Sequence, residues 1–210
     1  MSVEEMSVVG IDVGAESKGF HAVALRRGTF EIRASTEPSE IVEWCKERKT
    51  SVAAVDAPCG WSMSGKSRAA ERDLRIDGRK ASCFATPTRA LATANESGFY
   101  NWVFNGEKLY KLLGEHFLLF DGIEREGPIC FETFPRAVVC ALAGKILPTK
   151  AKVRQRRTAL SERGYDDKLL PNIDFVDAAL CALAAHAFCQ GRFQQYGRKD
   201  EGFIVVPPCS

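Results

Sequence analysis

The architecture of this chain is indicated first by Ser7-Val8-Val9-Gly10-Ile11-Asp12-Val13-Gly14. Valine and isoleucine favour strands, and the final glycine is typical of a turn, so this run predicts a buried strand. One acid, Asp12, lies near the end of that strand. A lone carboxylate in such a place costs several kcal/mol unless it is hydrogen-bonded, paired or bound to a cation. Asp12 is therefore the first candidate for a functional residue.

The segments that follow predict a mixed sheet. Residues 20–25 and 29–34 read as two further strands, separated by short turns, so the first three strands are expected to form an antiparallel meander. Glu37-Pro38-Ser39 indicates the start of a helix that continues to Lys49, and residues 52–56 form the next apolar strand. A helical crossover of that length predicts parallel pairing between the first and fourth strands.

The rest of the chain completes an α/β domain. Residues 60–127 are rich in glycine and basic residues and partly helical, and we expect them to form an insertion between strands 4 and 5. A fifth strand is predicted at residues 129–134. We then expect helices at residues 135–143 and 175–189 and a short strand at residues 203–206. The whole chain, residues 1–210, is expected to form a single domain.

Three more acids resemble Asp12 in their placement. Asp56 and Glu132 each lie near the end of an apolar strand, and Asp177 lies on an alanine-rich helix. Side-chain alternation places Asp12 on the same side of its strand as Val8 and Gly10, and the same period applies to Asp56 and Glu132 within their strands. Asp174 precedes Asp177 by three residues and shares its helix face. Clustered carboxylates of this kind bind Mg²⁺ or Mn²⁺ and support hydrolysis at phosphorus.

Each acid also has a structural interpretation. Asp12 and Asp56 precede Gly14 and Pro58, so either could brace a turn. Asp174 lies near a helix start, where the macrodipole favours an acid. Glu132 could form a salt bridge with one of the arginines. Asp177 lies about one turn further into its helix and is the hardest of the acids to explain without a metal.

The composition is that of an ordinary globular protein. Of the 210 residues, 45% are hydrophobic and 27% are charged, with a formal net charge of +2. The eight cysteines include no C-x-x-C pair and read as reduced, buried side chains, which favours a cytoplasmic location. The three histidines are far apart and lack cysteine partners, so a structural zinc site is not expected. The N-terminal residues lack the pattern of a signal peptide, and no apolar stretch is long enough to span a membrane.

Several short motifs, taken in order, resemble a known family. They are Val9-Gly10-Ile11-Asp12-Val13-Gly14, Val55-Asp56-Ala57-Pro58, Arg68 through Arg75, Phe84-Ala85-Thr86-Pro87-Thr88-Arg89, Glu132-Thr133-Phe134-Pro135 and Asp174-Phe175-Val176-Asp177-Ala178. The ordered set is similar to the predicted RNase H-like nucleases and, more narrowly, to the family known as domain of unknown function 429. The likeness extends from the first strand to Ile204-Val205-Val206-Pro207.

This resemblance implies an RNase H-like fold, a mixed five-stranded sheet flanked by helices, with Asp12 as the central metal ligand. The ending Asp174-x-x-Asp177-Ala is similar to the last helix of the Holliday-junction-resolvase branch, where both acids approach the metals. One departure concerns the glutamate that ribonucleases H carry on their first long helix. Only loose candidates for it exist here, namely Glu40, Glu43 and Glu47, so Asp56 and Glu132 must complete the set.

Basic residues gather in two segments, which favours a polyanionic partner. Residues 64–90 contain seven Lys or Arg against three Asp or Glu, and residues 144–164 contain seven against one. We expect contacts to substrate phosphates from Arg72, Arg75, Lys150 or Arg154. The alternative is that these residues form solvated helix faces.

Three hypotheses about function follow. The preferred one is a Mg²⁺- or Mn²⁺-dependent nuclease with a two-metal mechanism. Asp12, Asp56, Glu132 and Asp177 are its catalytic acids, and Asp174 is an additional metal ligand. The second is a nucleotide-binding or phosphoryl-transfer protein of the actin-like ATPase type, although 210 residues cannot supply the two domains such proteins use. The third is a nucleic-acid-binding module without turnover. The oligomeric state is left open, a homodimer included.

Overall fold

The computed structural model describes residues 6–123 and 126–209. Five strands form the centre of a mixed sheet in the order β3-β2-β1-β4-β8. Strands β1, β2 and β3 pair antiparallel, while β4 and β8 run parallel to β1 and β4, respectively. The predicted meander, the parallel crossover and the mixed sheet flanked by helices are thus confirmed, although the sheet has more than the five strands expected. The strands are β1 (Ser7–Val13), β2 (Phe20–Arg26), β3 (Thr29–Ser35), β4 (Thr50–Asp56) and β8 (Ile129–Glu132).

Three further strands extend this sheet beyond β8. Strand β7 (Leu118–Leu119) pairs with the start of β8, and β10 (Gly202–Val206) pairs with its end. Strand β9 (Gln194–Arg198) pairs antiparallel with β10 and forms the outer edge. Only β10 is predicted by the sequence pattern. A separate ribbon is formed by β5 (Arg75–Ile76) and β6 (Arg79–Lys80).

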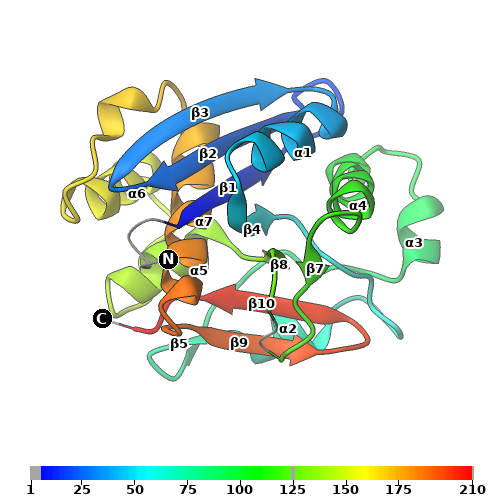
Figure 1. The fold of residues 1–210 in the computed structure, drawn as a ribbon. Helices are drawn as coiled ribbons and strands as arrows, with labels where there is room; N and C mark the ends of the chain where they lie inside the picture. The colour runs from blue at the N-terminus through cyan, green and yellow to red at the C-terminus, as the bar shows by residue number, and fades with distance from the viewer. Residues whose placement is uncertain (1–5, 124–125, 210) are drawn as a thin grey trace.

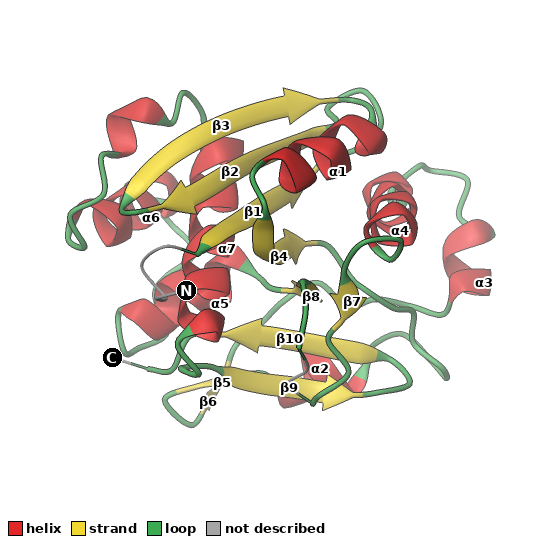
Figure 2. Ribbon diagram, viewed as in Figure 1, coloured by secondary structure: helices red, strands yellow, loops and turns green. Residues whose placement is uncertain are grey.

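Helices cover both faces of the sheet (Figures 1 and 2). Helix α1 (Pro38–Glu47) and helix α4 (Asn101–Leu113) pack together over one face, called here the α4 face. Helix α7 (Ile173–Cys189) and helix α5 (Pro135–Leu142) cover the other, the α7 face. The other described helices are α2 (Ala69–Asp73), α3 (Arg89–Thr93), α6 (Lys152–Ser161) and a 3₁₀ helix (Asp167–Leu169). None of the helices in the described ranges is long and apolar enough to cross a membrane.

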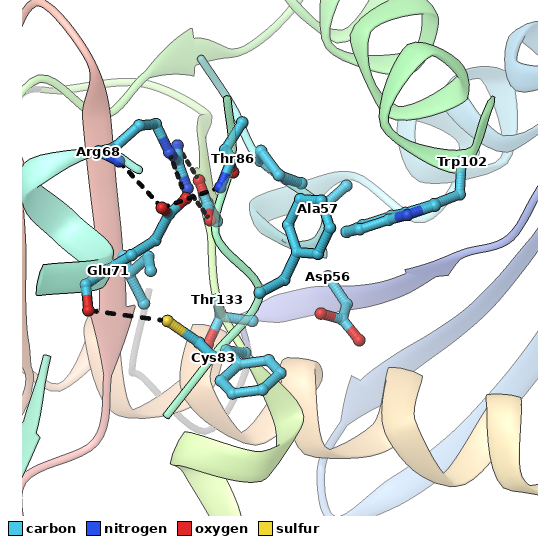
Figure 3. Close-up of a pocket in the computed structure, with 13 residues that line it drawn as sticks. Asp56, Ala57, Arg68, Glu71, Cys83, Thr86, Trp102 and Thr133 are labelled. Atoms are coloured by element: carbon cyan, nitrogen blue, oxygen red, sulfur yellow. Dashed lines mark hydrogen bonds and ion pairs between the residues drawn. The ribbon is translucent and has the colours of Figure 1, made fainter. Parts of the chain in front are cut away.

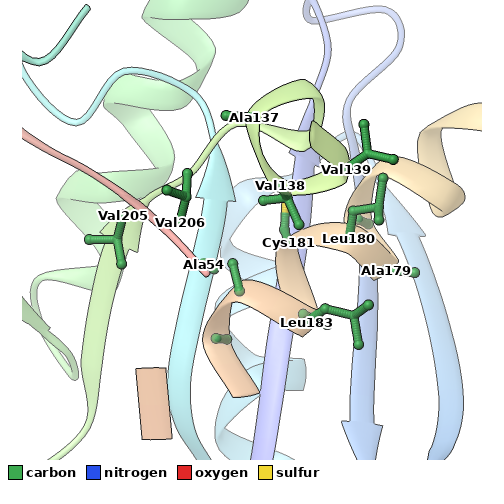
Figure 4. Close-up of a cluster of buried hydrophobic side chains, with 14 of the residues drawn as sticks. Ala54, Ala137, Val138, Val139, Ala179, Leu180, Cys181, Leu183, Val205 and Val206 are labelled. Atoms are coloured by element: carbon green, nitrogen blue, oxygen red, sulfur yellow. The ribbon is translucent and has the colours of Figure 1, made fainter. Parts of the chain in front are cut away.

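The strand alternation expected from the sequence separates two apolar cores. Val9, Ile11 and Val55 face helices α1 and α4, whereas Val8 and Ala54 face helices α5 and α7. Figure 4 shows the second core, where Leu180, Cys181 and Leu183 of α7 lie near Ala54 of β4, Val138 and Val139 of α5, and Val205 and Val206 of β10. Asp12 and Asp56 continue the series of Val8 and Ala54 and so project on the α7 face.

Helix α7 lies directly against strand β1. A Cβ atom added at Gly10 would overlap the backbone carbonyl oxygen of Ala178 and the backbone nitrogen of Ala182. The helix begins after Asn172, whose side chain accepts hydrogen bonds from the backbone N–H groups of Asp174 and Phe175, at 3.0 and 3.1 Å. The cap and the close approach together bring the first turn of α7 to the Asp12 end of β1.

The segment 60–127 contributes to both cores. Leu109 and Leu113 of α4 belong to the α4-face core, and Leu74 and Ile76 belong to the α7-face core. Two parts of the sequence predictions lie outside the described residues. They are residues 1–5, where no signal peptide is expected, and residues 124–125 of the expected insertion.

Candidate metal centre

Four acids converge on the α7 face of the sheet. Asp12 and Asp56 are register partners on the parallel strands β1 and β4, so their side chains project side by side. Asp174 and Asp177 approach from the first turns of α7. Asp12 is 8% exposed and Asp177 is 6% exposed, so two of these carboxylates are largely removed from solvent. Residues from three distant parts of the sequence thus meet at one place.

The pKa values of these acids reflect burial and mutual repulsion. Burial, followed by the negative charges of Asp177 and Asp174, raises the pKa of Asp12 to about 7. Burial, followed by the charges of Asp12 and Asp177, raises the pKa of Asp56 well above its ordinary value. Burial also raises the pKa of Asp177 to about 6, although the positive charge of Arg156 opposes the shift. Ionisation of Asp12, Asp56 and Asp177 in the folded protein therefore costs more free energy than ionisation of an exposed aspartate.

Among the described residues, two basic side chains form ion pairs with acids of this cluster. Arg156 of α6 forms an ion pair with Oδ2 of Asp177. The Nζ of Lys18, in the loop after β1, lies 2.7 Å from Oδ1 of Asp174. Lys18 is half exposed, and interactions with Asp174, Asp12 and Asp177 raise its pKa despite the opposing effect of burial. Four carboxylates are thus only partly balanced by two cations.

The donor atoms present fit a divalent metal ion. Oδ1 of Asp177 is buried without a hydrogen-bond partner in the part of the chain that the structure describes. One ligand atom each from Asp12, Asp174 and His21 lie within 4.8 Å of one another. Carboxylate oxygens are the preferred ligands of Mg²⁺ and Mn²⁺, and a cation would offset the repulsion among the acids. An acidic cluster able to hold a metal is therefore present.

Glu132 does not share this environment. Its register partner on β4 is Val55, which faces helices α1 and α4, so Glu132 projects on the α4 face, opposite Asp12 and Asp56. Both carboxylate oxygens accept hydrogen bonds from Arg68, at 2.6 and 2.7 Å, and Oε2 also accepts one from the backbone N–H of Cys59, at 2.9 Å. Its contacts are those of the structural salt bridge considered as the alternative to a metal ligand.

Arg68 is the centre of a buried ionic network. Its side chain is fully buried, and its Nε donates to Glu71 at 2.9 Å. Glu71 also accepts hydrogen bonds from the backbone N–H groups of Arg68 and Thr86, both at 2.9 Å. Glu201 accepts hydrogen bonds from the backbone N–H groups of Ala69 and Met63, at 2.8 and 2.9 Å. We call Arg68, Glu71, Glu132 and Glu201 the arginine network.

A pocket connects the arginine network with the acidic cluster. Asp56 and Trp102 lie at one side of it and Arg68 and Glu71 at the other, with Thr86 and Thr133 between them (Figure 3). The hydroxyl of Thr86 is buried in this pocket without a hydrogen-bond partner among the described residues. The arginine network and the acidic cluster therefore border one pocket, although Glu132 and Asp56 project on opposite faces of the sheet.

The expected substrate-contact residues occupy two different places. Lys150 and Arg154 are exposed, just before and within α6, the helix whose Arg156 reaches Asp177. Arg72 and Arg75 instead donate to backbone carbonyls of their own segment, those of Ser67, Arg72 and Leu74. Of these two basic segments, only the one around α6 has a described bond to the acidic cluster, the ion pair of Arg156 with Asp177.

The glutamates of helix α1 pair with other residues. Glu40 bonds to Arg33, Glu43 to Lys46 and Glu47 to Arg48, all at the surface. None of the three contributes to the pKa shifts of Asp12, Asp56 or Asp177. Helix α1 therefore adds no acid to the cluster.

Sequence reasoning missed three partners of the acids. Lys18 follows the predicted turn after Asp12, and Arg156 belongs to a predicted basic segment, but neither position signals an ion pair across the fold. His21 lies opposite Asp12 in the antiparallel β1–β2 register. The predicted meander could have located His21 near Asp12, because strands joined by a short turn place such residues opposite one another.

Comparison with known proteins gives a family and one similar structure. No curated protein matches the chain. A solved structure similar to it is T. thermophilus RuvC in complex with Holliday junction substrate, with 14% sequence identity and a TM-score of 0.43, over 89% of this chain and 97% of that chain. The family described as "Protein of unknown function (DUF429)" matches residues 10–202, and the chain belongs to this family.

Proposed function

We propose that the chain is a metal-dependent nuclease that hydrolyses phosphodiester bonds of nucleic acid with Mg²⁺ or Mn²⁺. The observation that carries this proposal is the convergence of Asp12, Asp56, Asp174 and Asp177, with raised pKa values at three of them and an unpartnered oxygen on Asp177. A protein gains little from a buried cluster of repelling carboxylates unless a cation binds there.

The four aspartates are proposed as the metal ligands and catalytic acids. Metal ions bound there would lower the pKa of a water molecule and stabilise the leaving oxygen, as in two-metal hydrolysis. Arg156 orients Asp177 through its ion pair. Ligation by Glu132 stays a prediction that would require this side chain to leave Arg68, so we give Glu132 the role of anchoring the loop after Asp56 through the backbone N–H of Cys59.

Helix α6 supplies the proposed contacts to the substrate backbone. Lys150 and Arg154 are exposed near the start of α6, the helix whose Arg156 pairs with Asp177, and their positive charge would attract phosphates toward a cluster that by itself repels them. Arg72 and Arg75 are proposed as weaker contributors, because their guanidinium groups already bond to backbone carbonyls.

The test is cleavage of labelled DNA and RNA by the purified chain with Mg²⁺, Mn²⁺ or EDTA. We expect cleavage that requires the metal and no ATP, and its loss in Asp12→Asn and in Asp177→Asn. The matched control is Asp73→Asn, an exposed acid of α2, which should retain activity. Full activity in both cluster variants would refute the proposal. Nucleic-acid binding that ignores both the metal and Asp12→Asn would instead favour a binding module.

A reducing compartment such as the cytoplasm is proposed as the place of action. All eight cysteines are free thiols, and burial raises the pKa of several of them, among them Cys45 to about 12. Free, buried thiols are usual where glutathione and thioredoxin keep cysteine reduced. The test is mass spectrometry of thiols alkylated in intact cells, in which disulfide-bonded cysteines would contradict this location.

A further inference from the structure

His21 lies against the acidic cluster, although its sequence context gave no sign of a metal ligand. It is the register partner of Asp12 in the antiparallel pair of β1 and β2, so the two side chains project on the same face. One of its ring nitrogens, one oxygen of Asp12 and one oxygen of Asp174 all lie within 4.8 Å of one another. These three atoms are close enough together to be ligands of one metal ion.

A second observation points to a ligand at this position. His21 is only 9% exposed, and its Nδ1 is buried without a hydrogen-bond partner among the described residues. Buried polar atoms almost always have a partner, and an unsatisfied one costs about 1–3 kcal/mol. Phe175 packs edge-on against the imidazole, with ring centroids 4.9 Å apart. The ring is therefore held in place by packing rather than by hydrogen bonds from Nδ1.

Lys18 places a positive charge where a cation would bind. Its Nζ lies 2.7 Å from Asp174, one of the three proposed ligands, and its side chain is 51% exposed. A half-exposed lysine has a flexible stem and can move into solvent when a metal ion takes its place. Asp174 thus already accepts a cation, which shows that the position is electrostatically suited to one.

We propose that His21 is a nitrogen ligand that, with Asp12 and Asp174, makes one metal position of the cluster selective for transition metals such as Mn²⁺ and Co²⁺ over Mg²⁺. This inference rests on the proposed function, because it assumes that the aspartates bind metal. Imidazole nitrogen suits transition metals, whereas Mg²⁺ prefers oxygen and retains its waters. The position would therefore discriminate between ions that an all-carboxylate site accepts alike.

The first test measures metal affinity without any substrate. Co²⁺ binding is followed by its visible absorption and Mg²⁺ binding by calorimetry, in the wild type, His21→Gln and the matched control His186→Gln, a half-buried histidine near the end of α7. We expect His21→Gln to weaken Co²⁺ binding at least about tenfold, which is about 1.4 kcal/mol, and to change Mg²⁺ binding less than about threefold on the same scale. Equal loss for both metals, or no loss for Co²⁺, would overturn the inference.

A second measurement leaves His21 intact and so does not depend on how that variant folds. In His116→Gln/His186→Gln protein, His21 is the sole histidine, because the chain contains three. Electron spin echo spectroscopy of the Mn²⁺-loaded protein should show a nitrogen coupling that changes when histidine is labelled with ¹⁵N. A spectrum insensitive to the label would overturn the inference.

The two proposals can fail separately. A ¹⁵N-sensitive coupling in a protein that cleaves no nucleic acid would leave the His21 site standing and remove the nuclease. Metal-dependent cleavage lost in Asp12→Asn, with Co²⁺ affinity unchanged in His21→Gln, would leave the nuclease standing and remove the nitrogen ligand.

Discussion

Two groups of buried acids meet near one pocket and differ in how their charge is satisfied. In the arginine network, Glu132 accepts three hydrogen bonds, two of them from the fully buried Arg68. Backbone N–H groups hold Glu201 and lower its pKa in spite of burial. In the acidic cluster, Asp12 and Asp56 have raised pKa values because burial and like charges act on them together. Burial alone therefore does not distinguish the two groups, whereas the excess of carboxylates over positively charged partners does.

The greatest loss of stability is expected when the arginine network loses its arginine. Arg68→Met leaves Glu71 and Glu132 buried without their shared cation, and loss of one partner of a buried ion pair costs about 3–5 kcal/mol. Chemical denaturation should show a fall of this size in the free energy of unfolding. Arg72→Met, on the exposed side of the same short helix, is the control and should change stability by less than about 1 kcal/mol. Equal losses in the two variants would remove the distinction between the network and the surface.

At the acidic cluster, removal of a charged side chain should stabilise the protein, whereas in the arginine network it should destabilise it. Asp12 has a pKa of about 7 in the folded state, above its ordinary value of 3.8, so the folded protein binds the proton more tightly. The contribution of Asp12 to wild-type stability therefore falls as pH rises from about 4 to about 7, and the penalty is complete above that range. Asp12→Asn lacks the penalty. In EDTA at pH 8 we expect the variant to be more stable, by on the order of a few kcal/mol.

The stability difference between the wild type and Asp12→Asn should depend on pH and on bound metal. At pH 4 the wild type and Asp12→Asn should be equally stable in EDTA, because the carboxyl is then protonated in the folded protein. With saturating Mn²⁺ at pH 8 the order should reverse, because the ion binds only the native wild-type site tightly. Thermal unfolding measures all three conditions. A variant less stable than the wild type in EDTA at pH 8 would show that Asp12 is satisfied by protein groups.

Smaller changes, in nucleic-acid binding, are expected on substitution of Lys150 and Arg154. Lys150→Gln and Arg154→Gln should each weaken nucleic-acid binding by about 1 kcal/mol and lower the slope of log K against log salt by about one, as expected for one lost phosphate contact. Fluorescence anisotropy over a salt series with Ca²⁺ in place of the active metal measures both. Arg72→Gln is the comparison, and a slope change equal to that of Arg154→Gln would place the substrate path along both basic segments.

The arrangement of the central sheet was predictable from the sequence. Val8, Gly10 and Asp12 alternate with Val9 and Ile11, and this period placed Asp12 on a definite face. A short turn predicted antiparallel neighbours, and a helical crossover predicted a parallel one. The position of Asp56 beside Asp12 followed from the same reasoning, because parallel strands end at the same edge of a sheet.

Other features depend on contacts that no local pattern encodes. Alternation assigns Glu132 to one side of its strand, but every residue of β8 is buried, so only the pairing of Val55 with Glu132 determines which face of the sheet that side is. Arg68 is fully buried although arginine usually lies at the surface. Strand β9 reads Gln-Gln-Tyr-Gly-Arg and lacks the apolar residues by which a strand is recognised.

The contact at Gly10 gives that position an influence on chemistry in which it takes no part. Because the glycine has no side chain, helix α7 rests on the backbone of β1, and this spacing sets the span between acids carried by the helix and acids carried by the strand. An ion of fixed radius tolerates only a narrow span between its ligands. The absence of a Cβ atom at Gly10, two residues before Asp12, therefore sets the spacing of the proposed metal ligands.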